Sequence, residues 1–311
     1  MMNINDIRHH SKYPKVTIIV LVYNGLKWLD ACLQSLLRTN YLNYEVVIVD
    51  NKSSDESVRY ILTHYPDIKV IENRKNYGTA KGNNIGMRYA LKSGADYVVL
   101  LNQDIIVSPD WLIEMVNVAE THKDIGVLSP IQYDYKGEQI DLNFRKILDR
   151  TSYFDDVEKD GIKEYYDFNE TIAASMMIRR NVLERINMFD EIYFIYNEDP
   201  DFCRRAIYHG YRVTGIPKSK VNHNHSMIKK HLIPEKIRFF IKRNRIIYYL
   251  KDPKHSFIYN FKDTFIWAKR YKNIYPEMEI RFGTKVKVVL SIIVLIPIVY
   301  FHHKMDRTIR G

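Results

Sequence analysis

The chain has 311 residues, of which 46% are apolar and 27% are charged, so it can form one large core with an appendage or two modest domains. This composition excludes a disordered chain. Lys and Arg outnumber Asp and Glu by 47 to 37, and the resulting charge of +10 favours anionic partners such as nucleotides or phospholipid surfaces. Cys32 and Cys203 are far apart and suggest neither a disulfide framework nor a zinc site.

Residues 1–15 form a polar tail with no apolar run suited to a signal peptide, so we expect the protein to stay in the cytoplasm. Residues 16–130 then alternate between short apolar runs and amphipathic stretches. This pattern is typical of strands joined by crossover helices in a mostly parallel sheet. We expect strands over residues 16–22, 45–49, 68–71, 97–101 and 125–128.

Two helix starts in this half carry capping signals. Residues 53–56 read Ser-Ser-Asp-Glu, the pattern of a capping box, and Ser108 stands before Pro109 at a second expected start. Ligands of such sheets bind beyond the carboxyl ends of the strands, so the loops that follow the first four strands should line one crevice.

From residue 133 to 169 the sequence is polar and irregular, and we interpret it as an insertion that could shape a second binding site. A further strand is expected over residues 173–178. It is followed by a helix over residues 200–209 that Gly210 closes.

The C-terminal part, residues 227–311, is basic and apolar. Residues 237–250 predict a basic amphipathic helix suited to an anionic membrane surface. Residues 288–301 form an apolar run of about 14 residues, whose helix would reach only about 21 Å against a hydrocarbon core of roughly 30 Å. We expect an interfacial or re-entrant anchor, and a buried closing helix is the alternative.

The crevice loops carry groups suited to a nucleotide. Tyr23 and Asn24 offer an aromatic face and a tight turn, and Asp50 can accept hydrogen bonds from a base N–H or a ribose hydroxyl. The loop 76–86 combines glycines with Lys81, a cation suited to phosphate, in front of a helix N-terminus. The candidate nucleotide-binding residues are Tyr23, Asn24, Asp50, Asn76, Gly78, Lys81, Asn83, Asn102 and Gln103.

The loop after the fourth expected strand contains a single carboxylate, Asp104. Because a bare carboxylate would repel a diphosphate, its presence there favours a divalent cation, Mg²⁺ or Mn²⁺, between the two. Residues 221–226 follow a strand and offer two imidazoles as further metal ligands. We favour His223, with His225 as the fallback.

Carboxylates also gather where the helix over residues 200–209 begins. Asp199 before Pro200 is well suited to cap it, and Glu198 and Asp201 favour its dipole. A capping carboxylate is rigidly placed, as a general base must be. We therefore take Asp199 as the candidate base and Glu198, Asp201 and Arg204 as acceptor-side residues.

Over residues 16–226 the sequence resembles family 2 glycosyltransferases, especially the rhamnosyltransferase-like branch of bacterial polysaccharide synthesis. The motifs that carry this resemblance stand in the expected order: Val22-Tyr23-Asn24-Gly25, Asp50-Asn51-Lys52-Ser53-Ser54-Asp55, the loop 76–86, Leu101-Asn102-Gln103-Asp104, the segment 173–178, Met188-Phe189-Asp190-Glu191 and Asn197-Glu198-Asp199-Pro200-Asp201.

The resemblance implies a GT-A fold with a nucleotide-sugar half, residues 16–130, and an acceptor and catalytic half, residues 131–226. It also implies that Asp50 contacts the nucleoside, that Asp104 binds the metal, that Asp199 is the base and that His223 binds the metal or the diphosphate. Two positions depart from the pattern. Asn102 replaces the first acid of a common Asp-x-Asp pair, and Leu21 replaces a common proline.

The implied activity is inverting transfer from a dTDP- or UDP-sugar to a hydroxyl of a glycan or lipid-linked glycan at the inner face of the plasma membrane. A catalytically silent nucleotide- or lipid-binding relative is the alternative, supported by Asn102. A sugar nucleotidyltransferase would need a glycine-rich, arginine-bearing loop where residues 23–28 stand. Nucleic acid is not an expected partner, because the basic residues concentrate near the C-terminal apolar segments.

Overall fold

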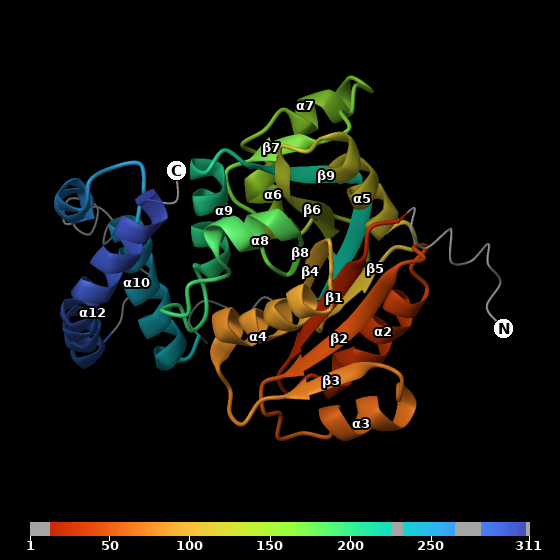
Figure 1. The fold of residues 1–311 in the computed structure, drawn as a ribbon, viewed down its shortest axis with the longest axis horizontal. Helices are drawn as coiled ribbons and strands as arrows, with labels where there is room; N and C mark the ends of the chain where they lie inside the picture. Colours follow the sequence, from red (N-terminus) through yellow and green to blue (C-terminus); the bar gives the residue numbers. More distant parts are fainter. Residues whose placement is uncertain (1–12, 225–232, 265–280, 309–311) are drawn as a thin grey trace.

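The computed structural model describes residues 13–224, 233–264 and 281–308. Over these ranges the chain folds around a nine-stranded mixed sheet with helices on both faces (Figure 1). The strand order is β3-β2-β1-β4-β8-β6-β9-β5, and β7 pairs with β9 beside this path. The expected α/β fold class, a mixed sheet flanked by helices, is confirmed.

The first half of the sheet is parallel, as predicted. β1 pairs with β2 and β4, and β2 pairs with β3, all in parallel register. Helices connect these strands, so their carboxyl ends meet at one edge. The strands are β1 (Val16–Val22), β2 (Tyr44–Asp50), β3 (Lys69–Glu72) and β4 (Tyr97–Asn102), and the helices are α2 (Leu26–Leu37), α3 (Ser57–His64) and α4 (Gly78–Lys92).

The second half of the sheet mixes directions. β8 runs antiparallel between β4 and β6, whereas β9 runs parallel to β6 and antiparallel to β5 and β7. The elements are β5 (Ile105–Val107), α5 (Trp111–Thr121), β6 (Ile125–Tyr133), β7 (Tyr166–Phe168), β8 (Ser175–Arg179), α8 (Arg180–Ile186), α9 (Glu198–Tyr208) and β9 (Arg212–His223).

The central strands are apolar at nearly every position because both of their faces are covered. Along β1, Ile18 and Val20 pack into one core with α2 and α5, and Ile19 packs into the other with α4, α8 and α9. Strands buried on both faces read as continuous apolar runs, which is the signal that made them visible in the sequence.

The segment 133–169 is more ordered than expected. It forms α6 (Leu142–Leu148), α7 (Tyr153–Glu158) and β7, and the Asp141 side chain caps α6 by accepting hydrogen bonds from the amides of Asn143 and Phe144. Elements of three to seven residues are too short to show a periodic pattern, which is why the sequence of this segment looks irregular.

The predicted helix caps were also wrong. α3 begins at Ser57 and α5 at Trp111, and neither helix has a side-chain cap. The side chain of Ser53 binds Asp50, and that of Ser108 donates to the carbonyl of Lys220. These side chains serve tertiary contacts, which local sequence patterns cannot reveal.

The helices after the sheet, within the described ranges, include α10 (Glu235–Leu250) and α12 (Phe282–Thr308), and residues 257–264 between them are also helical. α10 and α12 lie side by side next to α9, at one side of the molecule (Figure 1). α12 has 27 residues and is long and apolar enough to cross a membrane. The helix length that we estimated from the apolar run alone was too short, because polar residues at both ends of the run are also helical.

Most of the apolar surface of α12 is exposed. Val294 has 73% of its surface accessible, whereas Val299 is buried and belongs to the same core as Ile247 and Leu250 of α10. Only 11% of its most apolar 18-residue window is buried. The alternative of a buried closing helix is therefore wrong for α12.

Candidate active site

The carboxyl ends of the parallel strands surround a cavity of about 250 Å³. The loops after β1, β2, β3 and β4 all contribute to it, which confirms that they line one crevice. The segment between α8 and α9 forms the opposite wall. The lining residues are Leu21, Tyr23, Asn51, Asn76, Gly78, Thr79, Asn102, Gln103, Asp104, Phe194 and Ile195.

Gln103 connects the loops after β1 and β4. Its Oε1 atom accepts from the Tyr23 amide at 2.9 Å, and its Nε2 atom donates to the Tyr23 carbonyl at 3.3 Å. Asn24 has a left-handed backbone, φ 50°, and its Oδ1 atom accepts from the Ser54 amide at 2.8 Å. Gln103 thus both lines the cavity and fixes the Tyr23 loop, whereas Asn24 holds that loop without lining the cavity.

Asp50 lies beneath the cavity rather than in its wall. It is 2% exposed and accepts hydrogen bonds from the amide of Ser53, at 3.0 Å, and from its hydroxyl. The neighbouring Asn51 lines the cavity and donates to the Gly78 carbonyl at 3.0 Å. Asp50 therefore organises the loop after β2, and Asn51 is the residue of this motif that faces the ligand space.

The start of α4 packs closely against the segment between α8 and α9. Gly78 has φ +80°, and a Cβ atom there would lie 2.0 Å from the Phe194 carbonyl oxygen. That oxygen accepts from the Thr79 amide at 2.8 Å. Only glycine permits this approach.

Two expected donor-binding residues lie outside the cavity wall. The Lys81 ammonium lies 3.1 Å from Glu191, at the surface, and Asn83 is buried within α4. Neither is among the lining residues. Their position differs from the one we expected, because the first turn of α4 directs Thr79 rather than Lys81 towards the cavity.

Asp104 lines the cavity, and His223 lies next to this carboxylate. Asp104 directly precedes β5, and Ile105 pairs with His223 at the end of β9, so the strand pairing brings the two side chains together. The His223 Nε2 atom lies 3.6 Å from the Asp104 Oδ1 atom. The favoured histidine is thus beside the carboxylate expected to bind the metal, and His225 lies outside the described residues.

This pair fits a divalent cation that also binds a ligand phosphate. Among the described residues, no cluster of three or more His, Cys, Asp or Glu side chains could hold a metal. Mg²⁺ is commonly bound by one or two carboxylates together with substrate phosphates, and Mn²⁺ also accepts imidazole. Asp104 and His223 would supply the protein ligands, and a diphosphate and water would complete the coordination.

Glu198 and Asp199 form the first turn of α9. The Asp199 Oδ2 atom accepts from the Ala173 amide at 3.2 Å, and Glu198 accepts from the hydroxyl of Thr79, which lines the cavity. Burial raises the pKa of Asp199, and the charge of Glu198 raises it further; burial also raises the pKa of Glu198. These raised values are typical of groups that exchange protons near neutral pH.

Asp199 is not the helix cap we expected. α9 begins at Glu198, and Asn197 occupies the cap position without a side-chain hydrogen bond. Asp199 instead sits inside the first turn and is held from the side by Ala173. The hydrogen bond from Ala173, just before β8, therefore holds the Asp199 side chain in place, and helix capping does not.

Asp201 and Arg204 face the C-terminal helices. Asp201 is fully buried and lies 3.0 Å from Arg205 and 3.1 Å from Lys251, and the Arg204 guanidinium stacks 3.8 Å from the centre of the Tyr248 ring. Neither residue lines the cavity. Their position differs from the acceptor-side role that the sequence suggested, because the helix turns these side chains away from the crevice.

Sequence reasoning missed several lining residues. Asn51 and Thr79 stand inside motifs that we had singled out, so their polar side chains were available signals. Phe194 and Ile195 carry no such signal, because their place in the wall depends on how the segment before α9 folds.

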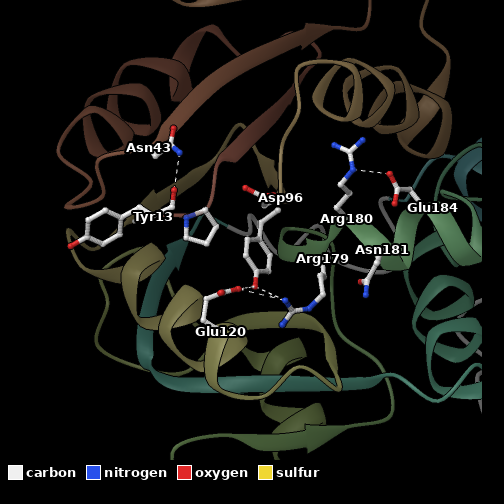
Figure 2. A pocket seen from close by; sticks show the side chains of 10 residues that line it. Tyr13, Asn43, Asp96, Glu120, Arg179, Arg180, Asn181 and Glu184 are labelled. Atoms are coloured by element: carbon white, nitrogen blue, oxygen red, sulfur yellow. Dashed lines mark hydrogen bonds and ion pairs between the residues drawn. The ribbon is translucent and has the colours of Figure 1, made fainter. Parts of the chain in front are cut away.

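A larger cavity of about 590 Å³ lies at the opposite edge of the sheet, where β1 and β4 begin (Figure 2). Its charged groups compensate one another: Tyr97 donates to Glu120 at 2.5 Å, and Arg179 donates to Tyr97 at 2.7 Å. Because ligands of such sheets bind at the carboxyl ends of strands, we interpret this cavity as a structural feature.

Comparison with known proteins agrees with the fold. Residues 17–187, more than half of the chain, match the family model described as glycosyl transferase family 2. The chain is 26% identical over 217 residues to the dTDP-rhamnosyl transferase RfbF of Shigella flexneri, covering 66% of this chain and 67% of that protein. It is 26% identical over 215 residues to the rhamnosyltransferase WbbL of Escherichia coli K12, covering 65% and 80%.

A solved structure with a similar fold is the mannosyltransferase PcManGT from Pyrobaculum calidifontis, in complex with GDP-Man and Mn²⁺. The TM-score is 0.59 at 16% sequence identity, and the match covers 97% of this chain and 85% of that one. The chain belongs to glycosyl transferase family 2 and has the GT-A fold.

Proposed function

We propose that the protein is an inverting, metal-dependent glycosyltransferase. It moves a sugar from a dTDP- or UDP-sugar to a hydroxyl of a growing, lipid-linked surface polysaccharide. The observation that carries this proposal is the convergence on one cavity of the Asp104–His223 pair and of Thr79, which binds the residue next to Asp199. Two relatives are named as rhamnosyltransferases, one of them as a dTDP-rhamnosyl transferase, and this supports the donor class.

Asp199 is the proposed base. It removes the proton of the acceptor hydroxyl while that oxygen forms a bond to the anomeric carbon. The bond from that carbon to the diphosphate breaks, and its electron pair leaves with the nucleoside diphosphate. A raised pKa suits Asp199 to this proton transfer. Because the displacement has one step, the anomeric configuration inverts.

Asp104 and His223 are the proposed metal ligands. A bound Mg²⁺ or Mn²⁺ neutralises the charge that develops on the leaving diphosphate. Asn102 leaves the loop after β4 with a single carboxylate, so we expect weak metal binding until the donor supplies its phosphate oxygens. Tyr23, Asn51 and Asn76 line the space that the nucleotide would occupy.

An anionic membrane surface at the inner face of the plasma membrane is the proposed location. The exposed apolar side chains of α12 suit the lipid, and Lys285, Lys287, Lys304 and Arg307 lie towards its two ends, where they can contact headgroups. A lipid-linked acceptor would then be delivered near the crevice. We propose residues 16–226 as the catalytic domain and residues 227–311 as the membrane-associating part.

The alternative is a catalytically silent protein that binds nucleotide or lipid, and Asn102 favours it. Turnover decides between the two. The purified protein is incubated with dTDP-rhamnose or UDP-GlcNAc and with Mn²⁺ or EDTA, and the released nucleotide is measured. Release that requires Mn²⁺ and is lost in Asp199→Asn supports transfer chemistry. Nucleotide binding without release from either donor supports the silent alternative.

A further inference from the structure

The turn that leads into α9 is strained. Tyr196 and Asn197 have φ values of 67° and 73°, so two consecutive non-glycine residues adopt the left-handed conformation. Each such residue costs of order 1 kcal/mol, and the cost is met only where surrounding contacts hold the backbone. Glu198 and Asp199 follow directly, so the turn decides where the proposed base stands.

A single buried side chain on α10 holds this turn. Asn244 is 0% exposed, and its Nδ2 atom donates to the carbonyl of Ile195 at 2.7 Å and to that of Tyr196 at 2.9 Å. Its Oδ1 atom accepts from Arg243 at 2.9 Å. All the polar atoms of this amide are therefore used. Loss of the amide would leave two buried carbonyls without their donor, at about 1–3 kcal/mol each.

The same segment is held from the other side by the donor half of the site. The Phe194 carbonyl accepts from the Thr79 amide of α4 at 2.8 Å, whereas Arg243, on α10 like Asn244, donates to the Ile192 carbonyl at 2.6 Å. Residues 192–197 thus lie between α4 and α10. Phe194 and Ile195 form one wall of the cavity.

We propose that Asn244 is a positioning residue for Asp199. This inference rests on the proposed function of Asp199 as the base. By donating to two consecutive carbonyls, Asn244 holds the left-handed turn that leads directly into Glu198, which binds the cavity residue Thr79, and Asp199. α10 packs against α12, so the C-terminal helices complete the catalytic half in addition to carrying the exposed apolar surface.

The test compares Asn244→Ala with a matched control. Asn260 is also buried, and its Nδ2 atom donates to the carbonyls of Leu250 and Asp252 at 3.1 and 2.8 Å, away from the turn. Both substitutions remove two hydrogen bonds from a buried amide to backbone carbonyls, and Asn244→Ala also removes the bond that Asn244 accepts from Arg243. With dTDP-rhamnose, Mn²⁺ and water as the acceptor, we expect Asn244→Ala to lower kcat by about tenfold or more, since small misplacements of a catalytic group have large effects. Asn260→Ala should leave kcat within about twofold at a similar loss of thermal stability.

A rescue variant separates strain from general destabilisation. Asn197 makes no side-chain capping bond, and glycine adopts a positive φ without strain. Adding Asn197→Gly to Asn244→Ala should therefore recover part of the lost kcat. The dissociation constant for dTDP with Mn²⁺ should change by less than about threefold in Asn244→Ala, because the interaction acts on the chemical step.

Hydrogen exchange gives a readout that does not depend on turnover. Amides 195–201 should exchange faster in Asn244→Ala than in Asn260→Ala. If the two variants have equal kcat and equal exchange over this segment, the inference is overturned while the proposed function stands. If the wild type releases no nucleotide from dTDP-rhamnose or UDP-GlcNAc, the proposed function fails, and with it the positioning of a base.

Discussion

The Nε2 atom of His223 lies 3.6 Å from the Oδ1 atom of Asp104, although β9 and β4 are far apart in the sequence. The antiparallel pairing of β5 with β9 produces this contact, because it sets Ile105 opposite His223. The contact sets an imidazole beside Asp104, a carboxylate that lines the cavity to which four strand ends contribute.

Asp104→Asn should weaken Mn²⁺-dependent nucleotide binding. The amide keeps the shape of the side chain but removes the charge that attracts the cation, and we expect a loss of about tenfold or more in affinity for dTDP or UDP. Titration calorimetry with Mn²⁺ measures it. Asp110→Asn, outside the cavity lining, is the control. Unchanged binding in Asp104→Asn would show that the metal is held elsewhere.

Asp199→Asn should abolish turnover while leaving the donor bound. An amide cannot take the acceptor proton, so we expect kcat to fall about 10²-fold or more with little change in the dissociation constant for dTDP. Initial rates of nucleotide release and calorimetry check the two halves of this prediction. A variant that retains full kcat would require another base.

The rate should fall at acidic pH, and Glu198 should affect the pH at which the rate declines. Asp199 works only when deprotonated, and burial together with the Glu198 charge raises its pKa. Activity should therefore decline as the pH falls through a value above about 3.9, the ordinary pKa of aspartate. Glu198→Gln removes the charge but can still bind Thr79, so the acidic limb of kcat/KM should move to lower pH. An acidic limb at the same pH in both proteins would contradict this coupling.

Lys251→Met should destabilise the protein strongly. The Lys251 ammonium is buried 2.6 Å from Asp190 and 3.1 Å from Asp201, and its removal leaves uncompensated buried charge at a cost of about 3–5 kcal/mol. Urea unfolding measures the change. Lys123→Met, which removes an exposed pair with Glu120, should cost less than about 1 kcal/mol.

The same network predicts how stability depends on pH. Burial alone would raise the pKa of Asp190, but the charge of Lys251 together with the hydrogen bond and charge of His302 outweighs burial and holds this pKa well below its usual range. A lowered pKa stabilises the folded state above the unfolded pKa, and this contribution is lost as the pH falls. The wild type should therefore lose stability between about pH 5 and pH 2, and Lys251→Met should lose less over that interval. Parallel pH profiles would contradict this account.

Membrane binding should depend on the exposed face of α12. Leu290 and Val294 are exposed, so a double substitution to Glu should leave the fold intact and reduce flotation with vesicles that contain anionic phospholipid. Leu62→Glu, at an exposed position of α3, is the control. Equal flotation of both variants would exclude α12 as the membrane contact.

The sequence predicted the elements whose signals are local. β1 and β4 were evident because strands buried on both faces are continuously apolar, and the polar residues after them predicted the crevice. The pairing of β5 with β9 and the bond from Asn244 to Tyr196 join distant residues, so no local pattern could reveal them. The sequence does carry one signal for Asn244, because its spacing places it on the buried face of α10 with Ile247 and Leu250.

The central claim is that the cavity binds a nucleoside diphosphate together with a metal. A thermal-shift panel with UDP, dTDP, GDP and CMP, each with Mn²⁺ and again with EDTA, tests it most directly. We predict that one of the diphosphates stabilises the protein only with Mn²⁺, by about 2.7 kcal/mol at a ligand concentration of roughly 100 times Kd. An unchanged unfolding temperature with every nucleotide would contradict the assignment of the cavity at Asp104 and His223 as the donor site.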